Sequence, residues 1–560
     1  KIFTNIFMIK FIKHRNNIVY RCMLKGILVL SISSILAQNL ETIPLDWVNH
    51  YGLESHNGIA LWNQDWESGP FLFDGTFTHF PLRYGRWIQK GRSTTTIDTI
   101  PDTSIVDSWF NYEQGDYLQD ELEVGLHTFG ENRKINLDAY KHSFGGQANQ
   151  YSLMDGSSSP IQQSYGIQYQ SNENSQQIWA GLGHFITYNG IPDSTSSGEI
   201  ISRIVSTGVK YKKIWENSFI EFSLNQFQNR RNVNHSQSEY LGDHFLNRSQ
   251  LKGRFTRNTR WGVQYFIGIS HHNRSLMDSL TMIQEWQTVY DGISFKGLNL
   301  KTGFIQSPYE DTKAIYEATY EKQFDLVYVK GNLSKYYQPR LITFWPGSTN
   351  MMETWNKKSI NIQYSHKQGF LSFQIGNNAS DRWVRPNYVD ETPYTPIPLS
   401  NDPYPIFDFN YYAIRSDIHL WEDLKLHGSI TGVDTVNILT DGVGQKGYVA
   451  MSGKRWLFSN TMDFRFTLSA NGWLNRSNEL QFDYVSGEMK QNKSTESLLN
   501  IWIFNLDIEA IVSTFTIRYT IKNILAAINP GNSSYQYSFD QNYPALGRQM
   551  AIGFEWHFND

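Results

Sequence analysis

The chain has little cysteine, no excess of positive charge and no long hydrophobic run beyond its N-terminal region. Its single cysteine, Cys22, lies near the start, so disulfides and thiol chemistry are excluded for the rest of the chain. The 49 Lys and Arg residues against 53 Asp and Glu residues give a formal charge of -4, which argues against a nucleic-acid binder that depends on positive charge. Beyond residue 37 no stretch approaches about 18 consecutive apolar residues, so spanning helices are not expected.

Aromatic residues are abundant instead. The 560 residues include 17 Trp, 32 Tyr and 34 Phe, while only 18% are charged, against roughly 25% in ordinary soluble domains. Length alone would favour several domains. No linker, fixed repeat or low-complexity tract divides the chain, however, so we expect one large unit.

The N-terminal region has the pattern of a secretory signal. Lys25 precedes an apolar run over residues 26–37, which ends at Ala37, and a polar chain begins at Gln38. A basic start, a short apolar run and a small residue are typical of a cleaved signal peptide. We predict an upstream segment plus signal peptide over residues 1–37, with the signal at 23–37; a buried helix or a membrane anchor is the alternative.

The rest of the chain is dominated by alternation of apolar and polar side chains, which is the period of a β-strand. Residues 261–270 alternate in this way, and residues 359–376 form a hairpin pattern that turns near residues 366–369. The C-terminal residues place one apolar face on Met550, Ile552, Phe554, Trp556 and Phe558. The chain is therefore predicted to be all-β.

The composition of the two faces indicates the kind of β protein. The apolar face is rich in Tyr, Trp and Phe, while the other carries Ser, Thr, Asn, Gln and Gly with scattered charges. Such strands lie between lipid and a wet lumen, and they must close because lipid cannot pair backbone groups. At about 9–11 residues per strand, we predict a transmembrane antiparallel β-barrel of about 16–22 strands with long extracellular loops over residues 108–560. A soluble all-β protein is the alternative.

The C-terminal residues resemble the last strand of TonB-dependent outer-membrane receptors. They begin with Tyr543-Pro544, continue with Gly547-Arg548 and end in the alternating strand up to Phe558. Residues 515–525 look like the family's penultimate strand. The resemblance implies an outer-membrane barrel whose final apolar face, from Met550 to Phe558, is read by the barrel-assembly machinery. In this chain Asn559 and Asp560 follow the final aromatic residue.

The segment before the barrel departs from that family, whose members carry a larger N-terminal plug and a short energy-coupling box. No such box is evident after Gln38. Residues 71–77 look like a plug strand followed by an Asp-Gly turn, which is also the pattern of an ordinary hairpin. Residues 38–107 are therefore predicted to be a periplasmic or lumenal segment, with a truncated plug as one interpretation.

No group of residues points to an enzyme. The adjacent pairs His271-His272 and Ser365-His366 would point to opposite faces of a strand, so neither pair can act jointly as metal ligands or as nucleophile and base. No phosphate-binding loop is present. We expect no enzymatic activity, no metal and no cofactor.

Charged residues of the polar face are predicted to line the lumen, where they either filter solutes by charge or simply pair with one another. They are Arg415, Asp417, Asp463, Arg465, Asp507, Glu509, Arg518 and Glu555. Aromatic residues in predicted loops are candidates for ligand capture or for an interface girdle. They are Tyr336, Tyr337, Trp345, Tyr394 and Tyr404.

These observations predict an outer-membrane barrel of a Gram-negative-type cell that passes small polar solutes through a hydrated lumen. One alternative is an energised TonB-dependent receptor with a reduced plug, whose partner would be an inner-membrane energy-coupling protein. Another is a non-transporting adhesin or anchor barrel. The expected surroundings are outer-membrane lipid, and no nucleic-acid partner is expected.

Overall fold

The fold comes from a computed structural model of the chain. The structure describes residues 41–42, 53–56, 59–62, 105–143, 161–190, 198–235, 242–277, 281–308, 310–339, 352–380, 407–436, 443–477, 480–483, 488–491, 497–529 and 547–559. The predicted signal segment and residues Trp345, Tyr394 and Tyr404 lie outside these ranges.

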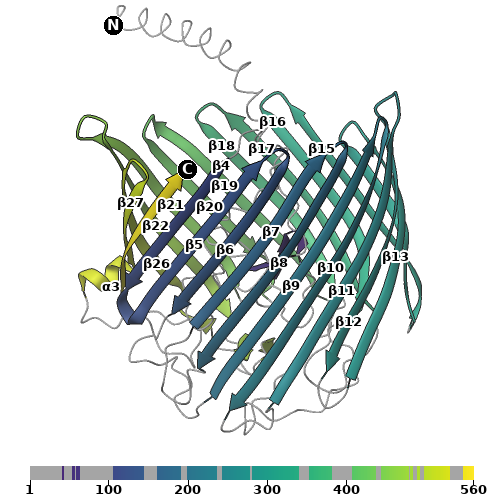
Figure 1. The fold of residues 1–560 in the computed structure, drawn as a ribbon, viewed down its shortest axis with the longest axis horizontal. Coiled ribbons are helices and arrows are strands. Elements are labelled where there is room, and N and C mark those ends of the chain that lie inside the picture. The colour runs from purple at the N-terminus through teal and green to yellow at the C-terminus, as the bar shows by residue number, and fades with distance from the viewer. Residues whose placement is uncertain are drawn as a thin grey trace, which may run out of the picture.

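Twenty-two antiparallel strands close into a barrel (Figure 1). The first half consists of β4 (Ile105–Gly115), β5 (Gln119–Gly130), β6 (Arg133–Ser143), β7 (Ile161–Glu173), β8 (Gln176–Gly190), β9 (Gly198–Trp215), β10 (Ser218–His235), β11 (Gly242–Asn258), β12 (Gln264–Met277), β13 (Thr281–Phe295) and β14 (Leu298–Ser307). The second half consists of β15 (Glu310–Phe324), β16 (Val327–Pro339), β17 (Met352–His366), β18 (Gly369–Ser380), β19 (Phe407–Trp421), β20 (Leu424–Val433), β21 (Val443–Leu457), β22 (Met462–Ser477), β26 (Ile501–Val512), β27 (Phe515–Lys522) and β28 (Gln549–Asn559).

The last strand closes the barrel by pairing with the first, with Phe554 opposite Tyr112 and Asn559 opposite Asp107. The predicted all-β barrel is therefore confirmed, at the upper end of the predicted strand number. The hairpin expected over residues 359–376 is β17 and β18. Among the described residues, no helix is both long and apolar enough to cross a membrane.

The short elements lie at the ends of the strands. They are η3 (Asp116–Leu118), a 3-10 turn between β4 and β5; β25 (Ser497–Leu498), which pairs with β22 just before β26; α3 (Ile524–Ile528), which follows β27; and the separate hairpin of β23 (Leu480–Asp483) and β24 (Glu488–Gln491).

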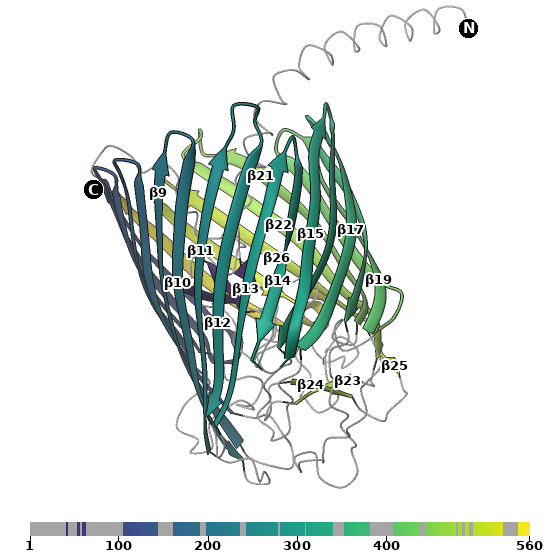
Figure 2. The ribbon, with the colours of Figure 1, turned by 90° about the vertical axis from the view of Figure 1, so that its right-hand side faces the viewer.

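The two ends of the barrel differ in their connections. At one end the strands are joined by tight turns, such as residues 131–132 and 174–175. At the other end the connections are longer, and residues 381–406 are one of them. Barrels of this type have short periplasmic turns and long extracellular loops, so the tight-turn end is periplasmic. Figure 2 shows these turns at the top. At one of them Gly297 has a φ of +88°, and a Cβ there would lie 1.9 Å from the Glu321 carbonyl oxygen, so glycine is required.

Alternating exposure distinguishes the two faces of each strand. On β28 the side chains of Ile552, Phe554 and Trp556 are 49%, 38% and 48% exposed, whereas Glu555 is 5% exposed. The exposed apolar face is the outer, lipid-facing wall, because the curvature of a closed barrel crowds the inner face. The strands therefore have the two-sided pattern that the sequence predicts.

Two predicted strands end differently from expectation. Residues 261–263 belong to a turn, not to β12, because the Thr259 backbone and hydroxyl both hydrogen-bond to Val263 and Gly262 adopts a φ of +74°. Residues 523–525 lie outside β27, because Asn523 has a φ of 55° and starts helix α3. Left-handed backbone cannot continue a strand.

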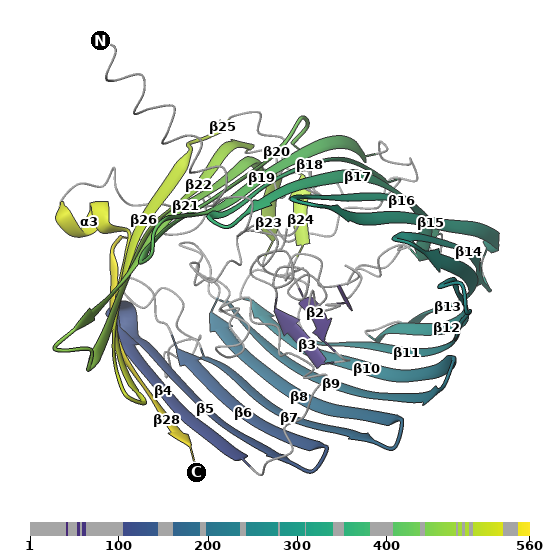
Figure 3. The same ribbon diagram turned by 90° about the horizontal axis from the view of Figure 1, so that it is seen from above.

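A small antiparallel sheet precedes the barrel. It consists of β1 (Glu41–Thr42), β2 (Leu53–His56) and β3 (Ile59–Trp62). Strand β3 lies against β8 and β9, and the view from above shows β2 and β3 within the ring of strands (Figure 3).

Candidate functional site

The inner face of the closing strands carries most of the charged residues that the sequence predicts for the lumen. In the register, Arg518 on β27 lies opposite Glu509 on β26 and Gly553 on β28. Gly553 in turn lies opposite Glu113 on β4. Because glycine has no side chain, Arg518 is the only long side chain between Glu509 and Glu113 in this row.

Arg518 is the centre of an ion-pair network. Its Nε lies 3.0 Å from Glu509 Oε1, and its second terminal nitrogen lies 3.4 Å from Glu555 Oε2. The other oxygen of Glu555 lies 2.7 Å from His557 Nε2, and His557 Nδ1 lies 3.7 Å from Asp107. Since the Arg518 and Glu555 side chains are only 15% and 7% exposed, these charges depend on one another for solvation.

Other predicted residues lie beside this network. Thr520 donates a 2.9 Å hydrogen bond to Asp507. Asp463 pairs with Arg465 at 2.7 Å and with Lys454 at 3.6 Å, and its side chain is 6% exposed. The structure therefore brings six of the eight predicted residues onto neighbouring strands, β22 and β26 to β28.

Three carboxylates near the network were missed at the sequence level: Glu121 and Glu123 are buried, and Glu113 is half-buried. Glu113 accepts a 2.7 Å hydrogen bond from Gln119, and Glu121 accepts one of 3.3 Å from Tyr140. Glu123 is 2% exposed. The sequence does contain a pattern that points to them, because Glu121 and Glu123 alternate with the lipid-facing residues Leu122 and Val124. We name the inner face of β26, β27, β28, β4 and β5 the acidic wall; its carboxylates are Asp107, Glu113, Glu121, Glu123, Asp507, Glu509 and Glu555.

A second charged surface, also missed, lies on β9, β10 and β11. Outer positions on these strands include Val209, Leu224 and Leu251, which are 49%, 53% and 51% exposed. Among the side chains that the structure describes, the opposite, inner face carries the cations Lys210, Lys212, Lys252 and Arg254, which we name the basic wall.

The cations of the basic wall have few acidic partners among the described residues. Lys210 lies 3.3 Å from Glu221. Lys212 lies over the ring of Phe219 at 4.6 Å from its centroid, and Arg254 lies over Phe266 at 4.3 Å. These contacts leave the wall with net positive charge, and its strand β9 lies against β3.

Arg415 and Asp417 lie apart from the closing network, on β19. Asp417 lies 3.1 Å from His427 Nδ1 on β20, and His427 Nε2 lies 3.0 Å from the Ser452 hydroxyl on β21. The structure thus assigns Asp417 a separate polar chain through His427, a residue that the sequence reading did not single out.

The two predicted aromatic residues that the structure describes lie in strand β16, not in a loop. The β16–β17 ladder continues as far as Pro339 and Met352, which draws Tyr336 and Tyr337 into the sheet. Tyr337 packs against Trp286, Ile305 and Met352.

Tyr336 belongs to an aromatic cluster near the extracellular end. Its ring stacks on Trp355 with a centroid distance of 6.2 Å and an interplanar angle of 4°, and Lys357 Nζ lies 5.5 Å from both ring centroids. Phe409 and Tyr411 complete the contact.

Asp434 lies at the end of β20 and accepts hydrogen bonds from the Asn410 side chain and backbone. Burial alone would raise the pKa of Asp434, but these hydrogen bonds outweigh burial and lower that pKa.

A metal centre is not evident in the described part of the chain, where no group of three or more His, Cys, Asp or Glu side chains could hold an ion. The final apolar face, including Ile552, Phe554, Trp556 and Phe558, lies on the outer wall of β28. Its reading by the assembly machinery stays a prediction.

Comparison with known proteins identifies the fold. No protein-family model matches the sequence, and no curated protein sequence is similar to it. The structure is similar to the FrpB iron transporter from Neisseria meningitidis, with a TM-score of 0.59, 9% identity and 82% of each chain covered.

Two further solved structures are similar over the same extent. A mutant of the ferric enterobactin receptor from Pseudomonas aeruginosa gives a TM-score of 0.58 at 9% identity, covering 82% of this chain and 81% of the other. The siderophore receptor PirA from Acinetobacter baumannii gives 0.55 at 9% identity, with the same coverage. The chain therefore has the fold of TonB-dependent receptors, and the predicted likeness to the barrel of these receptors is confirmed at the level of the fold.

Proposed function

We propose that this protein is a receptor-type transporter of the outer membrane, in which residues 38–104, the part of the predicted N-terminal segment that precedes β4, act as a reduced plug and transport of a small polar solute is energised from the inner membrane. The observation that carries the proposal is a segment of the chain, β1 to β3, inside a barrel of 22 strands. The similar proteins are an iron transporter and siderophore receptors, which supports uptake as the task.

Barrel size favours this function over the open pore that the sequence first indicated. Barrels of about 16–18 strands form aqueous channels, whereas 22-stranded outer-membrane transporters hold a plug in the lumen. A wall of 22 strands left open would admit solutes with little selection. A segment in the lumen restores selectivity, and it must then move or rearrange to let a solute pass.

The lumen favours a polar solute that carries charge. The acidic and basic walls lie on different arcs of the barrel, so the field across the bore has a direction. In the aromatic cluster close to the extracellular end, Trp355 and Phe409 are buried, and the half-buried ring of Tyr336 offers aromatic surface beside the cation of Lys357. A solute with planar and anionic groups fits that surface, which gives Tyr336 its proposed role in ligand capture.

Conductance tests the plug. In planar bilayers we expect the full-length protein to be nearly silent and a variant lacking residues 38–104 to give large, steady steps, since the deletion leaves all 22 barrel strands intact. Heat-dependent migration on a gel shows that both variants are folded. Equal large conductance of both would overturn the plug and restore the open-pore interpretation, while silence of both would favour the adhesin or anchor.

Cross-linking tests the energised step separately. Because the chain beyond Cys22 lacks cysteine, a Gln38→Cys variant has one reactive thiol near the start of the mature protein. We expect an adduct with an inner-membrane energy-coupling protein in whole cells, stronger when solute is present. Unchanged solute uptake after dissipation of the proton gradient would contradict energised transport, whatever the conductance shows.

A further inference from the structure

A pocket of about 530 Å³ lies on the wall of the barrel near the tight-turn end, away from the lumen. It is bounded by the end of β19, the start of β20, and strands β21 and β22. Small-molecule sites commonly measure about 300–1,000 Å³. Its floor and sides are formed by Trp421, Leu424, Gly453, Arg455, Phe464 and Phe466, and Glu422 and Asp423 border it.

The register places the floor of this pocket on the lipid-facing side. Leu424 lies opposite Gly453, and Gly453 lies opposite Phe466. Successive positions on the same faces include Val449 and Leu468, which are 51% and 41% exposed. In contrast, Asp463, which precedes Phe464 on β22 and points inward, is 4% exposed. The pocket therefore opens toward hydrocarbon.

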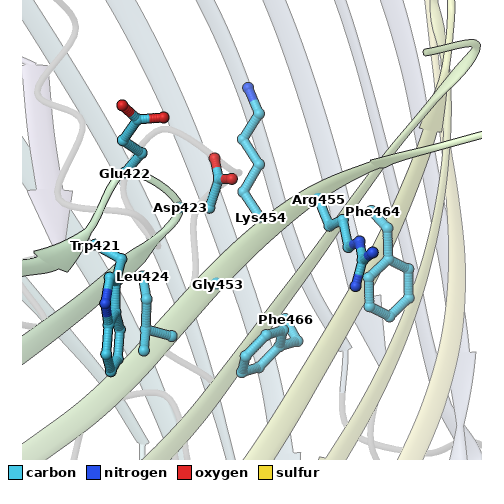
Figure 4. A pocket seen from close by; sticks show the side chains of 9 residues that line it. All are labelled: Trp421, Glu422, Asp423, Leu424, Gly453, Lys454, Arg455, Phe464 and Phe466. Atoms are coloured by element: carbon cyan, nitrogen blue, oxygen red, sulfur yellow. The ribbon is translucent and has the colours of Figure 1, made fainter.

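A glycine keeps the floor open. A Cβ on Gly453 would lie 2.3 Å from a ring carbon of Phe466, so the Phe466 ring lies directly over the glycine. Figure 4 shows Trp421 and Leu424 on one side of Gly453, with Arg455 and Phe464 on the other. Trp421 is 70% exposed and lies beside a tight turn, which is typical of the aromatic belt at the membrane–water boundary. The result is an apolar groove at interfacial depth.

Charges of both signs border the groove. Arg455 lies on the lipid-facing side, opposite Phe464 in the register, and forms no ion pair with any described residue. Glu422 and Asp423 make the adjoining turn between β19 and β20, also without an ion pair in the described ranges. Lys454 is occupied elsewhere, because its Nζ lies 3.6 Å from Asp463 on the inner face.

We propose that this pocket binds one phospholipid of the periplasmic leaflet with a phosphoethanolamine headgroup. An acyl chain lies over Leu424, Phe464 and Phe466. The phosphate accepts hydrogen bonds from the Arg455 guanidinium, which suits phosphate geometry. The ammonium donates to Glu422 and Asp423. A headgroup that is anionic and lacks an ammonium would be repelled by the two carboxylates. A headgroup with a trimethylated ammonium could not donate hydrogen bonds to these carboxylates.

Native mass spectrometry of the detergent-solubilised protein tests the site with three lipids: phosphatidylethanolamine, phosphatidylglycerol and phosphatidylcholine. We expect phosphatidylethanolamine to bind best. Arg455→Gln should weaken it about fivefold, the effect of one cation at a lipid surface. The double variant Glu422→Gln/Asp423→Asn should weaken phosphatidylethanolamine and leave phosphatidylglycerol unchanged or stronger.

Arg257→Gln is the matched control, because Arg257 also lies on the outer face near the tight-turn end, on β11, beside Phe255 and Tyr265. It should bind lipid like the wild type, and heat-dependent gel migration shows that each variant is folded. Equal binding of the three lipids by the wild type, or equal losses in Arg455→Gln and Arg257→Gln, would mean unspecific annular lipid and overturn the proposal. Weakening of both lipids by the acidic double variant would overturn the role of the ammonium.

Discussion

The acidic and basic walls are built by the same alternation, yet they treat their charges differently. On the acidic wall, Arg518 lies within 3.4 Å of two carboxylates and is largely buried. On the basic wall, Arg254 lies over an aromatic ring, and its Nε has no hydrogen-bond partner. Around Arg518 the charges of the acidic wall are thus paired with one another, and Arg518 links the neighbouring strands β26, β27 and β28.

This difference indicates a division of tasks. A charge that is paired within the wall mainly holds neighbouring β-strands together. If one partner is removed, the other charge is left without a counter-charge in a poorly solvated site. Lys212 and Arg254, which lie over aromatic rings and form no ion pair within the described ranges, remain available to a solute or to the lumenal segment. The basic wall, whose strand β9 lies against β3, is accordingly the surface on which we expect function more than stability to depend.

The largest expected loss of stability follows from the replacement of Arg518. We predict that Arg518→Met destabilises the barrel by about 3–5 kcal/mol, because Glu509 and buried Glu555 lose their partner. The matched change on the basic wall, Arg254→Met, should cost about 0.5–1 kcal/mol, the value of an isolated cation–π contact. Reversible urea unfolding in lipid vesicles measures both. Similar costs for the two variants would abolish the distinction between the walls.

The next effect concerns the outer faces, where the two walls should be alike. Ile552 behind the acidic wall and Leu251 behind the basic wall are 49% and 51% exposed to lipid. Replacing either with Arg should cost about 2–4 kcal/mol if the position lies near the bilayer midplane. Folding yield into vesicles reports the cost. A variant that folds as well as the wild type would place its strand in a different register or at a different depth.

The smallest expected effect is a change in ion selectivity. It is measured in the variant that lacks residues 38–104. Glu113→Gln/Glu121→Gln should shift the reversal potential in a salt gradient toward anion permeation, and Lys210→Gln/Lys252→Gln should shift it toward cation permeation. The two shifts should have opposite sign and comparable size. Shifts of the same sign would show that the walls do not act as opposing surfaces.

Much of the fold could be predicted from local pattern. The alternation in residues 549–558 identified β28 and the side on which Ile552 and Glu555 lie, because side chains alternate across a strand. The hairpin around residues 366–369 was predictable for the same reason. Strand number was predicted only as a range, because the ends of strands are set by partners, as at Pro339 and Met352.

The candidate site was predictable as a list of lumenal charges but not as a network. Arg415 and Arg518 look alike in sequence, since each follows an isoleucine in an alternating segment, yet only Arg518 lies between Glu509 and Glu555. Glu555 meets Arg518 across 37 residues of chain, and Asp107 meets His557 only because the barrel closes. Tyr336 and Tyr337 were assigned to a loop because nothing local marks how far a ladder extends.

The amino-acid sequence by itself determined that this protein is a two-sided β wall, since the period of two in polarity is a local property of each strand. The tertiary structure decided the closure at 22 strands, the pairing of Arg518 with its carboxylates and the separation of an acidic from a basic wall. Those outcomes depend on register between strands distant in the chain, which hydrogen bonds and side-chain packing set only when every strand has found its neighbours.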